Sequence, residues 1–482
     1  MRRVGITACG AYVPRLRLSR SVIAASTSWL RSAAPARVSG ERSFCNWDED
    51  AVTMAVEAAR LCLGARDTAA ISSVVLASTT PPFADRSNAG LVAGALDVSP
   101  RAAVADAGGS QRAGTSALLH ALRSGAADDE TLVVASDRRL AKPGSAQELT
   151  YGHGAAAALV GSDDLIAEFV GGATLHSDLV DHYRASGANF DYTLEERWVR
   201  DEGHMKLLPE ALSAALESAG VQPGTIARAI LPVPQRTAQS VARLLKLPPD
   251  CLAPDPADSC GDIGVGHPLL RLALALEAAT AGDMILLAGF GQGIDAIVLR
   301  ATGAASDGDL SRSTSRMLGE RIEETQYTRF LSHCGLLEME FGMRAERDNR
   351  TAQTASFRRQ RDLLAFVGGR CSACGTVQFP KTHACVNPEC RAFETQVDHP
   401  LAASTGRVKT FTEDWLAYCA RPPLVYGNVA LEGGGNAFIE FADTMPGELA
   451  VGSEVRFVFR IKDVDRLRRF HRYFWKATPV RS

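Results

Sequence analysis

The sequence lacks any uninterrupted apolar run of the ~18 residues that a membrane-spanning helix needs, because Arg, Asp or Gly interrupts each candidate. It also lacks an excess of charge of either sign. Its 52 Lys and Arg residues stand against 55 Asp and Glu residues, which gives a formal net charge of −3. A near-neutral chain has no overall electrostatic attraction to nucleic acid or to anionic lipid. We therefore expect a protein that binds neither nucleic acid nor a membrane.

The cysteines do not have the density of a disulfide framework. There are 11 of them, an odd number, scattered over 482 residues. This usage fits a reducing compartment. Residues 1–7 (MRRVGIT) indicate a first strand rather than a secretory signal. With 46% hydrophobic and 22% charged residues, the composition is that of an ordinary folded protein, and we expect it in the cytoplasm.

Short apolar runs closed by Gly, Ser or Pro alternate with amphipathic stretches from the N-terminus to about residue 300. The expected strands are 73–78, 131–136, 155–161, 226–233, 284–290 and 296–300. The expected helices are 50–63, 113–124, 207–219 and 268–281. Strands that alternate with helices predict an α/β fold with a mostly parallel sheet covered on both faces.

The order of these elements occurs twice. Each series runs helix, strand, Gly-rich loop, helix, strand, strand, with an offset of roughly 150 residues. A duplicated βαβαβ unit is the simplest account, with halves at 1–165 and 166–303; a chance alternation of common elements is the alternative. The small and polar stretch 303–316 then predicts a linker that leads into a helical arm, so we assign 304–365 to linker and arm.

Two close cysteine pairs follow in residues 366–482. Cys371 and Cys374 form a CxxC turn, and Cys385 and Cys390 lie a short distance further on. Four thiolates at this spacing suit the tetrahedral coordination of Zn²⁺, with no open position for catalysis. The alternative is four unrelated buried cysteines. We expect a zinc ribbon whose Zn²⁺ is structural.

Short strands separated by Pro, Gly and Asp fill the rest of 366–482 and suit a small OB-type β-barrel. Zinc ribbons and OB barrels often bind nucleic acid, and residues 466–476 mix basic and aromatic side chains as a single-strand groove does. The near-neutral charge of the whole chain argues against this alternative.

Five segments carry a resemblance to a known superfamily: 50–60, 111–118, 152–156, 261–266 and 282–293. The first 300 residues resemble the thiolase superfamily, specifically hydroxymethylglutaryl-CoA synthase and the type III ketoacyl synthases. The last 120 resemble the small zinc-ribbon/OB proteins that accompany such enzymes and help to hold acyl-CoA. The resemblance implies a homodimer that acts on a CoA or acyl-carrier-protein thioester.

The positions that match the family's catalytic residues are altered. In these condensing enzymes a cysteine begins the helix after the first Gly-rich loop and takes up the acyl group. That position holds Gln111, and an amide cannot form a thioester. The family's histidine falls in residues 231–234 (LPVP), its glutamate matches Thr79 and its asparagine matches Asp262. Acyl transfer through a cysteine is therefore not expected.

Three residues remain as candidate catalytic groups. Gln111 can donate a hydrogen bond to a thioester or enolate oxygen at a helix N-terminus, or it merely caps that helix. Asp262 and His267 can act as general acid and base if they converge, or they cap a turn and the helix 268–281. A glutamine in the nucleophile position of related ketosynthases is associated with decarboxylation.

Five residues are candidates for substrate binding. The resemblance places Thr79 beside the reaction centre, and Gly291 and Gln292 form a Gly-rich turn whose backbone N–H groups can approach the thioester. His182 and Tyr183 lie in a polar stretch that lines the substrate in the family, although a surface insertion would look the same.

We expect an acyltransferase of the condensing type that makes or breaks a C–C bond next to the thioester without an acyl-cysteine. Two alternatives are a retro-aldol or decarboxylating lyase that acts on an acyl-CoA, and a non-catalytic acyl-CoA scaffold or shuttle that partners an active thiolase.

Overall fold

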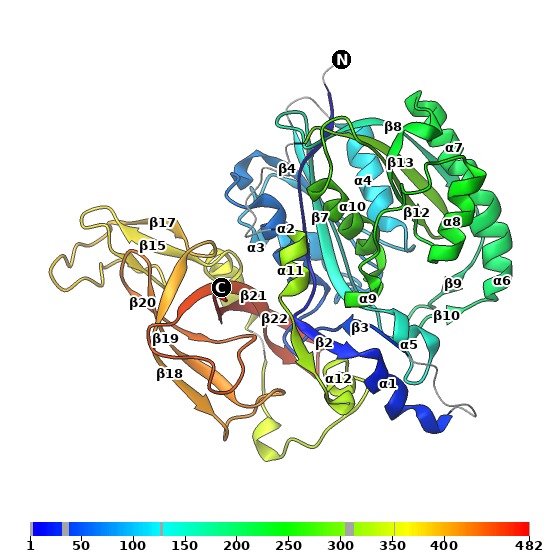
Figure 1. Ribbon diagram of the computed structural model, residues 1–482. Helices are drawn as coiled ribbons and strands as arrows, with labels where there is room; N and C mark the ends of the chain where they lie inside the picture. The colour runs from blue at the N-terminus through cyan, green and yellow to red at the C-terminus, as the bar shows by residue number, and fades with distance from the viewer. Residues whose placement is uncertain (1–2, 31–37, 126–128, 304–312, 351, 482) are drawn as a thin grey trace. The chain divides into compact units, whose positions relative to one another are not determined.

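The computed structural model describes residues 3–30, 38–125, 129–303, 313–350 and 352–481 (Figure 1). Its internal contacts divide the chain into two compact units. The first comprises Met1–Asn46, Asp50–Gly90 and Ser99–Cys334; the second comprises Trp47–Glu49, Leu91–Val98 and Gly335–Ser482. None of the described helices is long and apolar enough to span a membrane.

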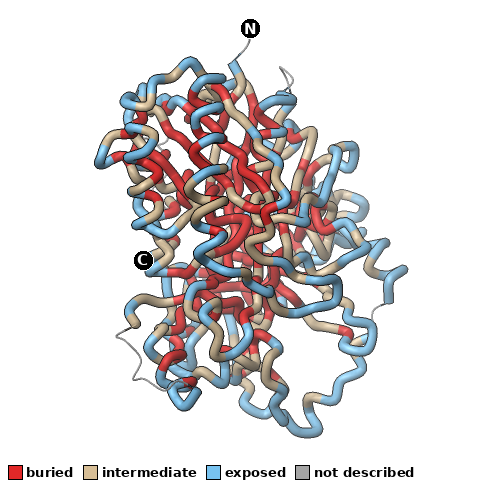
Figure 2. Tube along the Cα trace, turned by 90° about the vertical axis from the view of Figure 1, so that its right-hand side faces the viewer, coloured by how far each residue is buried: buried red, intermediate tan, exposed pale blue. Residues whose placement is uncertain are grey.

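A nine-stranded sheet forms the centre of the first unit, in the order β11-β12-β13-β8-β1-β7-β6-β4-β5. Its strands are β1 (Gly5–Tyr12), β4 (Ile71–Ala77), β5 (Ala103–Ala107), β6 (Glu130–Arg138), β7 (His153–Gly161), β8 (Ala167–His176), β11 (Ile226–Ile230), β12 (Met284–Phe290) and β13 (Gly293–Ala301). Each of the six runs expected as strands from the sequence overlaps one of these. Figure 2 shows the buried residues in red, and β7 and most of β13 are among them.

The sheet has two halves with the same pairing pattern. In one half β4 pairs parallel with β6, β6 antiparallel with β7, and β7 antiparallel with β1. In the other half β11 pairs parallel with β12, β12 antiparallel with β13, and β13 antiparallel with β8. The halves meet where β1 and β8 pair antiparallel. The predicted duplication is confirmed.

The expectation of a mostly parallel sheet is wrong, because the sheet is mixed. Three of its strand pairs are parallel and five are antiparallel. Parallel neighbours need a crossover of a dozen or more residues. Only Gly291 and Gln292 link β12 to β13, so this connection forms a hairpin.

The main helices of the first unit are α2 (Ala51–Leu63), α4 (Ala113–Ser124), α7 (Leu208–Ala219), α8 (Gln235–Leu244) and α10 (His267–Glu277), whereas α3 (Asn88–Ala95) begins in the first unit and continues in the second from Leu91. Asp50 caps α2 by accepting hydrogen bonds from the Val52 and Thr53 N–H groups. The helix therefore begins where the sequence predicts it, directly after this acidic residue. α4 and α10 share one buried core with strands of both halves, and α7 and α8 pack on β11, β12 and β13 in a second core.

Shorter elements complete this unit: β2 (Leu16–Ser19), β3 (Glu41–Ser43), β9 (His182–Tyr183), β10 (Tyr192–Thr193), β14 (Ile322–Glu324), α1 (Arg20–Ser26), α5 (Ala146–Thr150), α6 (Glu196–Trp198), the π-helix Val199–Leu207, α9 (Ala257–Cys260), α11 (Thr314–Gly319) and α12 (Tyr327–His333). β9 and β10 pair as a small hairpin. The helices between residues 313 and 364 are short, and the chain passes from the first unit to the second at Gly335.

Two antiparallel sheets form the second unit, together with the short helices α13 (Gln353–Arg358) and α14 (Gln360–Leu364). The first sheet has the order β16-β15-β17, with β15 (Val367–Cys371), β16 (Val377–Gln378) and β17 (Gln396–Pro400). The second has the order β20-β19-β18-β21-β22, with β18 (Thr405–Asp414), β19 (Leu424–Leu431), β20 (Asn436–Glu440), β21 (Glu454–Asp465) and β22 (Phe470–Pro479).

The five-stranded sheet lies where short strands of an OB-type barrel were expected, but no closed barrel is present among the described residues. The two end strands, β20 and β22, share no ladder there. A single bridge between Phe441 and Ala477 joins their ends. Phe457, Phe459 and Trp475 are fully buried along β21 and β22 and form an aromatic core against this sheet.

Candidate functional site

Gln111 lies two residues before α4, in the loop that follows β5, and its side chain is half-buried. Its amide Nε2 donates a hydrogen bond to Thr79 Oγ1 over 3.2 Å. Thr79 follows β4, the strand that pairs with β5. The structure therefore brings together two of the residues selected from the sequence, at the N-terminus of a helix of 12 residues.

Asp137, at the end of β6, holds this arrangement in place. It is fully buried. Its carboxylate accepts hydrogen bonds from Ser78 Oγ (3.2 Å), the Thr79 N–H (2.8 Å), Thr79 Oγ1 (3.0 Å), Thr80 Oγ1 (3.0 Å) and the Val265 N–H (3.1 Å). Burial raises the pKa of Asp137, and the N–H and O–H donors around it act in the opposite direction.

This network orients the Gln111 amide. The Thr79 hydroxyl donates its single hydrogen to Asp137. A lone pair on the same oxygen therefore accepts the hydrogen bond from the Gln111 amide. The amide then has a second N–H in a defined direction. A fixed donor at a helix N-terminus can stabilise negative charge that develops on a thioester or enolate oxygen.

Gly291 and Gln292 lie on the other side of Gln111. The Gly291 carbonyl accepts hydrogen bonds from Ser110 Oγ (2.7 Å) and Arg112 Nε (3.0 Å), the residues on either side of Gln111. Gln292 has φ +45° and donates from Nε2 to the His182 carbonyl over 3.3 Å. The turn between β12 and β13 is thus tied both to the start of α4 and to β9.

The β9–β10 hairpin joins the site through two arginines that sequence reasoning missed. Arg184 donates to the Thr79 carbonyl and to Asp191 Oδ1 (2.9 Å). Arg139 donates to Asp191 Oδ2 over 2.8 Å and stacks on the Tyr151 ring, with its guanidinium carbon 3.7 Å from the ring centre. Arg184 and Asp191 are seven residues apart across the hairpin, but Arg184 lies 105 residues from Thr79 and Arg139 lies 52 residues from Asp191, so no local spacing pattern connects the hairpin to the site.

Asp262 and His267 do not contact Gln111. Asp262 Oδ1 accepts from the Gly264 N–H at 2.8 Å. His267 donates from Nε2 to Asp255 over 2.9 Å and accepts from the Ile263 N–H at Nδ1 over 3.4 Å. Both ring nitrogens of His267 are therefore engaged within its own loop. That loop connects to the site through the Val265 N–H, which donates to Asp137.

Burial raises the pKa of four of the six cysteine thiols of the first unit. Burial raises the pKa of Cys260 to about 12 and that of Cys9 to about 12. Burial also raises the pKa of Cys251 and of Cys334. A nucleophilic cysteine needs the opposite shift, since the thiolate is the reactive form.

The four cysteines of the second unit converge on one point. Cys374 Sγ lies 3.6 Å from Cys385 Sγ, and Cys371 Sγ lies 3.9 Å from Cys390 Sγ. All four sulfur atoms lie within 4.8 Å of one another. A tetrahedral Zn²⁺ with bonds of about 2.3 Å places its sulfur ligands about 3.8 Å apart, so the four cysteines fit a closed structural zinc site.

Comparison with known proteins identifies both parts of the chain. A protein-family model matches residues 361–396, which contain the four cysteines. Its description is "ChsH2, rubredoxin-like zinc ribbon domain". The solved structure of MvaS in complex with 3-hydroxy-3-methylglutaryl coenzyme A superposes with a TM-score of 0.57 and 21% identity, over 70% of this chain and 93% of that chain. The fold is therefore that of the thiolase-fold condensing enzymes.

The relatives define the family more closely. Hydroxymethylglutaryl-CoA synthase of Methanocella arvoryzae is 31% identical over 301 residues, which is 60% of this chain and 85% of the relative. The Aeropyrum pernix enzyme of the same name is 31% identical over 330 residues, 66% of this chain and 91% of the relative. The chain belongs to the hydroxymethylglutaryl-CoA synthase family and carries a zinc ribbon domain after its thiolase-fold part. The resemblance seen in the sequence is confirmed.

Proposed function

We propose that the protein is a thiolase-fold enzyme that acts on a CoA thioester and makes or breaks a C–C bond beside the thioester carbonyl. Condensation of the kind named for its relatives is the main reaction type. No acyl-cysteine forms. The Gln111 amide stabilises the enolate oxygen, and the hydroxyl of Thr79 and the carboxylate of Asp137 hold that amide in direction.

The hydrogen bond from Gln111 to Thr79 is the observation that carries this proposal. An amide that merely capped α4 would place its oxygen on the helix N–H groups. Gln111 instead donates from its Nε2 to Thr79, in the loop that follows β4, so the donor is held in place before substrate arrives. Preorganised donors of this kind cost no reorganisation during the reaction.

The roles of the remaining predicted residues follow from their contacts. Asp262 is the proposed general acid or base, because its loop is tied to Asp137 through Val265. His267 positions that loop through Asp255. Gly291, Gln292 and His182 form the wall of the thioester site opposite Thr79. A carrier-protein thioester is the alternative acyl donor to CoA, and the cytoplasm is the proposed location.

Incubating the zinc-loaded protein with a panel of acyl-CoA esters, with product masses measured over time, tests the function. Sustained turnover supports an enzyme, and Gln111→Ala should then lower kcat by about 100- to 1,000-fold with little change in CoA affinity. Gln235→Ala is the control, since Gln235 is an exposed residue at the start of α8. Equal kcat in Gln111→Ala and wild type would refute the role of Gln111.

The products separate the reaction types. A longer acyl-CoA indicates condensation, a ketone or aldehyde with a shorter acyl-CoA indicates retro-aldol cleavage, and loss of CO₂ indicates decarboxylation. All three pass through an enolate, which the same amide would stabilise. Tight binding without turnover of any ester would instead make the protein an acyl-CoA scaffold.

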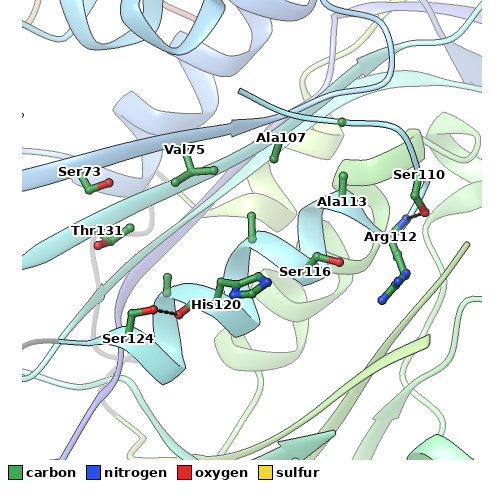
Figure 3. A pocket seen from close by; sticks show the side chains of 13 residues that line it. Ser73, Val75, Ala107, Ser110, Arg112, Ala113, Ser116, His120, Ser124 and Thr131 are labelled. Carbon is green, nitrogen blue, oxygen red and sulfur yellow. Dashed lines mark hydrogen bonds between the residues drawn. The ribbon is translucent and has the colours of Figure 1, made fainter. Parts of the chain in front are cut away.

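We also propose a homodimer built through the edge of the large sheet. Among the described residues β5 is the last strand of that sheet, with β4 as its one neighbour, and its residues are exposed or half-buried. Beside it, Ser116, His120 and Ser124 of α4 line a cavity of about 460 Å³ with residues of β4 and β5 (Figure 3). An open edge strand next to a recess suits pairing with a second copy.

A further inference from the structure

His182, the first residue of β9, and Arg184, which follows the strand, lie on one face of the β9–β10 hairpin. Successive side chains of a strand point to opposite faces, so residues two apart point the same way. Arg184 donates to the Thr79 carbonyl from this face. Tyr183 points to the other face, where its ring centre lies 5.6 Å from that of Tyr192. The imidazole of His182 is therefore on the side of the hairpin that faces Thr79.

The hairpin is held on both sides of its paired residues. Toward its tip, Asp191 forms ion pairs with Arg184 at 2.9 Å and with Arg139 at 2.8 Å. Only 3% of the Asp191 side chain is exposed. At its open end, the Leu194 N–H donates to the Asp181 carbonyl over 3.0 Å. A side chain on this hairpin therefore has a defined position before substrate binds.

The turn between β12 and β13 ties His182 to the start of α4. Gln292 donates from Nε2 to the His182 carbonyl over 3.3 Å. Gly291, the residue before it, accepts hydrogen bonds at its carbonyl from the residues on either side of Gln111. Together with the contact between the hairpin and the Thr79 carbonyl, two separate connections join His182 to the surroundings of the Gln111 amide.

Asp181 orients the imidazole of His182. Nδ1 of His182 lies 2.7 Å from Asp181 Oδ2. A carboxylate only accepts hydrogen bonds, so Nδ1 carries the hydrogen and Nε2 of the neutral ring keeps a lone pair. Within the described ranges of the chain, no group forms a hydrogen bond with this Nε2, and the His182 side chain is 15% exposed. A histidine held in this way can accept a proton at Nε2, and the carboxylate stabilises the imidazolium that results.

The other groups that face Asp181 leave its negative charge to His182. His204, in the π-helix Val199–Leu207, is a second histidine near Asp181. Burial lowers the pKa of His204 below its usual value, against the opposing charge of Asp181, so this ring is neutral at neutral pH. The Gln292 amide donates to Asp181 Oδ1 over 3.4 Å. Neither neighbour brings a positive charge that would compete for the carboxylate.

We propose that His182 is the general base of the reaction and that Asp181 is the residue that positions it. This inference rests on the proposed function, in which a C–C bond forms or breaks beside a thioester carbonyl. In condensation, Nε2 of His182 takes a proton from the carbon next to that carbonyl. The C–H electron pair becomes the C=C bond of the enolate, and the π electrons of the carbonyl move to its oxygen, to which the Gln111 amide donates.

The same two groups serve the cleavage direction. An electron pair on the enolate oxygen re-forms the carbonyl, and the carbon takes its proton from Nε2–H of the His182 imidazolium, which returns to the neutral ring. Condensation with a second carbonyl compound also needs an acid that protonates the oxygen of that compound. That separate role falls to Asp262, so the base and the acid are different residues.

Two measurements on the zinc-loaded protein test this assignment, with the acyl-CoA ester that wild type turns over fastest. One is steady-state kinetics, and the other is deuterium exchange in D₂O at the carbon next to the thioester, followed by mass spectrometry. His182→Gln should lower kcat and the exchange rate by about 100-fold or more with little change in KM. Asp181→Asn should lower both rates by about 10-fold or more, because Nδ1 of His182 loses the acceptor that fixes its tautomer.

His176→Gln is the matched control, since His176 is an exposed histidine at the end of β8, and it should keep both rates. Added imidazole should restore part of the exchange in His182→Ala, because a free base can replace the missing ring. Lost exchange that imidazole does not restore would mean a structural role and overturn the assignment.

The kinetic constants separate this inference from the proposed function. Wild-type kcat and exchange in His182→Gln would overturn the base and leave the proposed function intact. A raised KM with unchanged kcat would make His182 a binding residue and would also overturn its role as the base. A wild-type protein that binds acyl-CoA esters but turns none of them over would overturn both.

Discussion

Gln111 and Asp137 are linked through a single hydroxyl group. The Gln111 amide donates to Thr79 Oγ1 over 3.2 Å, and Thr79 Oγ1 donates to Asp137 Oδ2 over 3.0 Å. The three residues come from the loop before α4, the end of β4 and the end of β6. A buried carboxylate thereby sets the direction of a side chain that it does not touch.

Replacing Thr79 by valine should break this link while keeping the shape of the side chain. Gln111 would lose the acceptor that orients its amide, and a hydrogen bond of this kind is worth about 1 kcal/mol. We expect kcat on the acyl-CoA substrate to fall about 5- to 10-fold with KM nearly unchanged, because the contact acts on the transition state. Steady-state kinetics measure both constants.

Thr79→Ser is the companion variant, since it restores the hydroxyl without the methyl group. It should recover most of the lost kcat. If the serine and valine variants have the same kcat, the hydroxyl does not orient Gln111. A purely structural role for Thr79 would instead lower the thermal stability of both variants without separating their kcat values.

Local patterns in the sequence were enough to locate most strands and helices and the zinc ligands. Cys371 and Cys374 are three residues apart in the chain, and so their convergence can be recognised directly. The antiparallel pairing of β12 and β13 could also have been found, because even the expected strands 284–290 and 296–300 leave only five residues between them, too few for a parallel crossover. The expectation of a mostly parallel sheet overlooked that length.

The charged part of the site could not be predicted in the same way. Asp137 and Thr79 are hydrogen-bonded although they are 58 residues apart in the sequence, and Arg139 and Asp191 are 52 residues apart. Hydrophobic periodicity contains no information on such pairs. The sequence left open whether Asp262 and His267 converge or cap the turn and the helix, and in the structure the imidazole of His267 contacts Asp255. A polar pair close in sequence has many competing partners once the chain folds.

Asp255 should make the free energy of unfolding depend on pH in the acidic range. Burial alone would raise the pKa of Asp255, but the hydrogen bond and charge of His267 and the charge of Arg271 lower it below its usual range. A lowered pKa in the folded state means that protonation favours the unfolded chain. The stabilisation is complete above the pKa of an unfolded Asp, about 3.9, and is lost as the pH falls below it.

Urea unfolding at a series of pH values between about 6 and 3 measures this effect. The free energy of unfolding of wild type should fall with decreasing pH more steeply than that of Asp255→Asn. Asp250→Asn is the control, because Asp250 is exposed. Parallel curves for wild type and Asp255→Asn would show that the contacts of Asp255 do not perturb its ionisation.

The four ribbon cysteines should bind one Zn²⁺ per chain tightly. Cys374→Ser removes a ligand and should lower the zinc content to well under one equivalent, as measured by elemental analysis after dialysis. The second unit should then unfold at a lower temperature, since structural zinc contributes directly to folding. Cys419→Ser is the control, because Cys419 is a buried cysteine of the same unit outside the cluster.

A zinc content near one equivalent in Cys419→Ser and wild type, with loss only in Cys374→Ser, is the expected pattern. Full zinc retention in Cys374→Ser would contradict a four-cysteine site. Wild-type protein purified with much less than one equivalent would contradict a structural role altogether, because a closed tetrahedral site holds its metal tightly.

A lysine on β5 should prevent the proposed dimer. Val104 is 42% exposed on this edge strand, and natural sheets use lysine on open edges to block pairing with another chain. In a twofold dimer that pairs β5 with its copy, Val104→Lys would bring two like charges close together across the interface. Light scattering coupled to size exclusion should report a dimer for wild type and a monomer for the variant.

Leu244→Lys is the matched control, since Leu244 is 57% exposed on α8 and its replacement should leave the dimer intact. A Val104→Lys variant that stays dimeric would show that the interface does not include β5. A wild type that is monomeric at tens of micromolar concentration would contradict the homodimer itself.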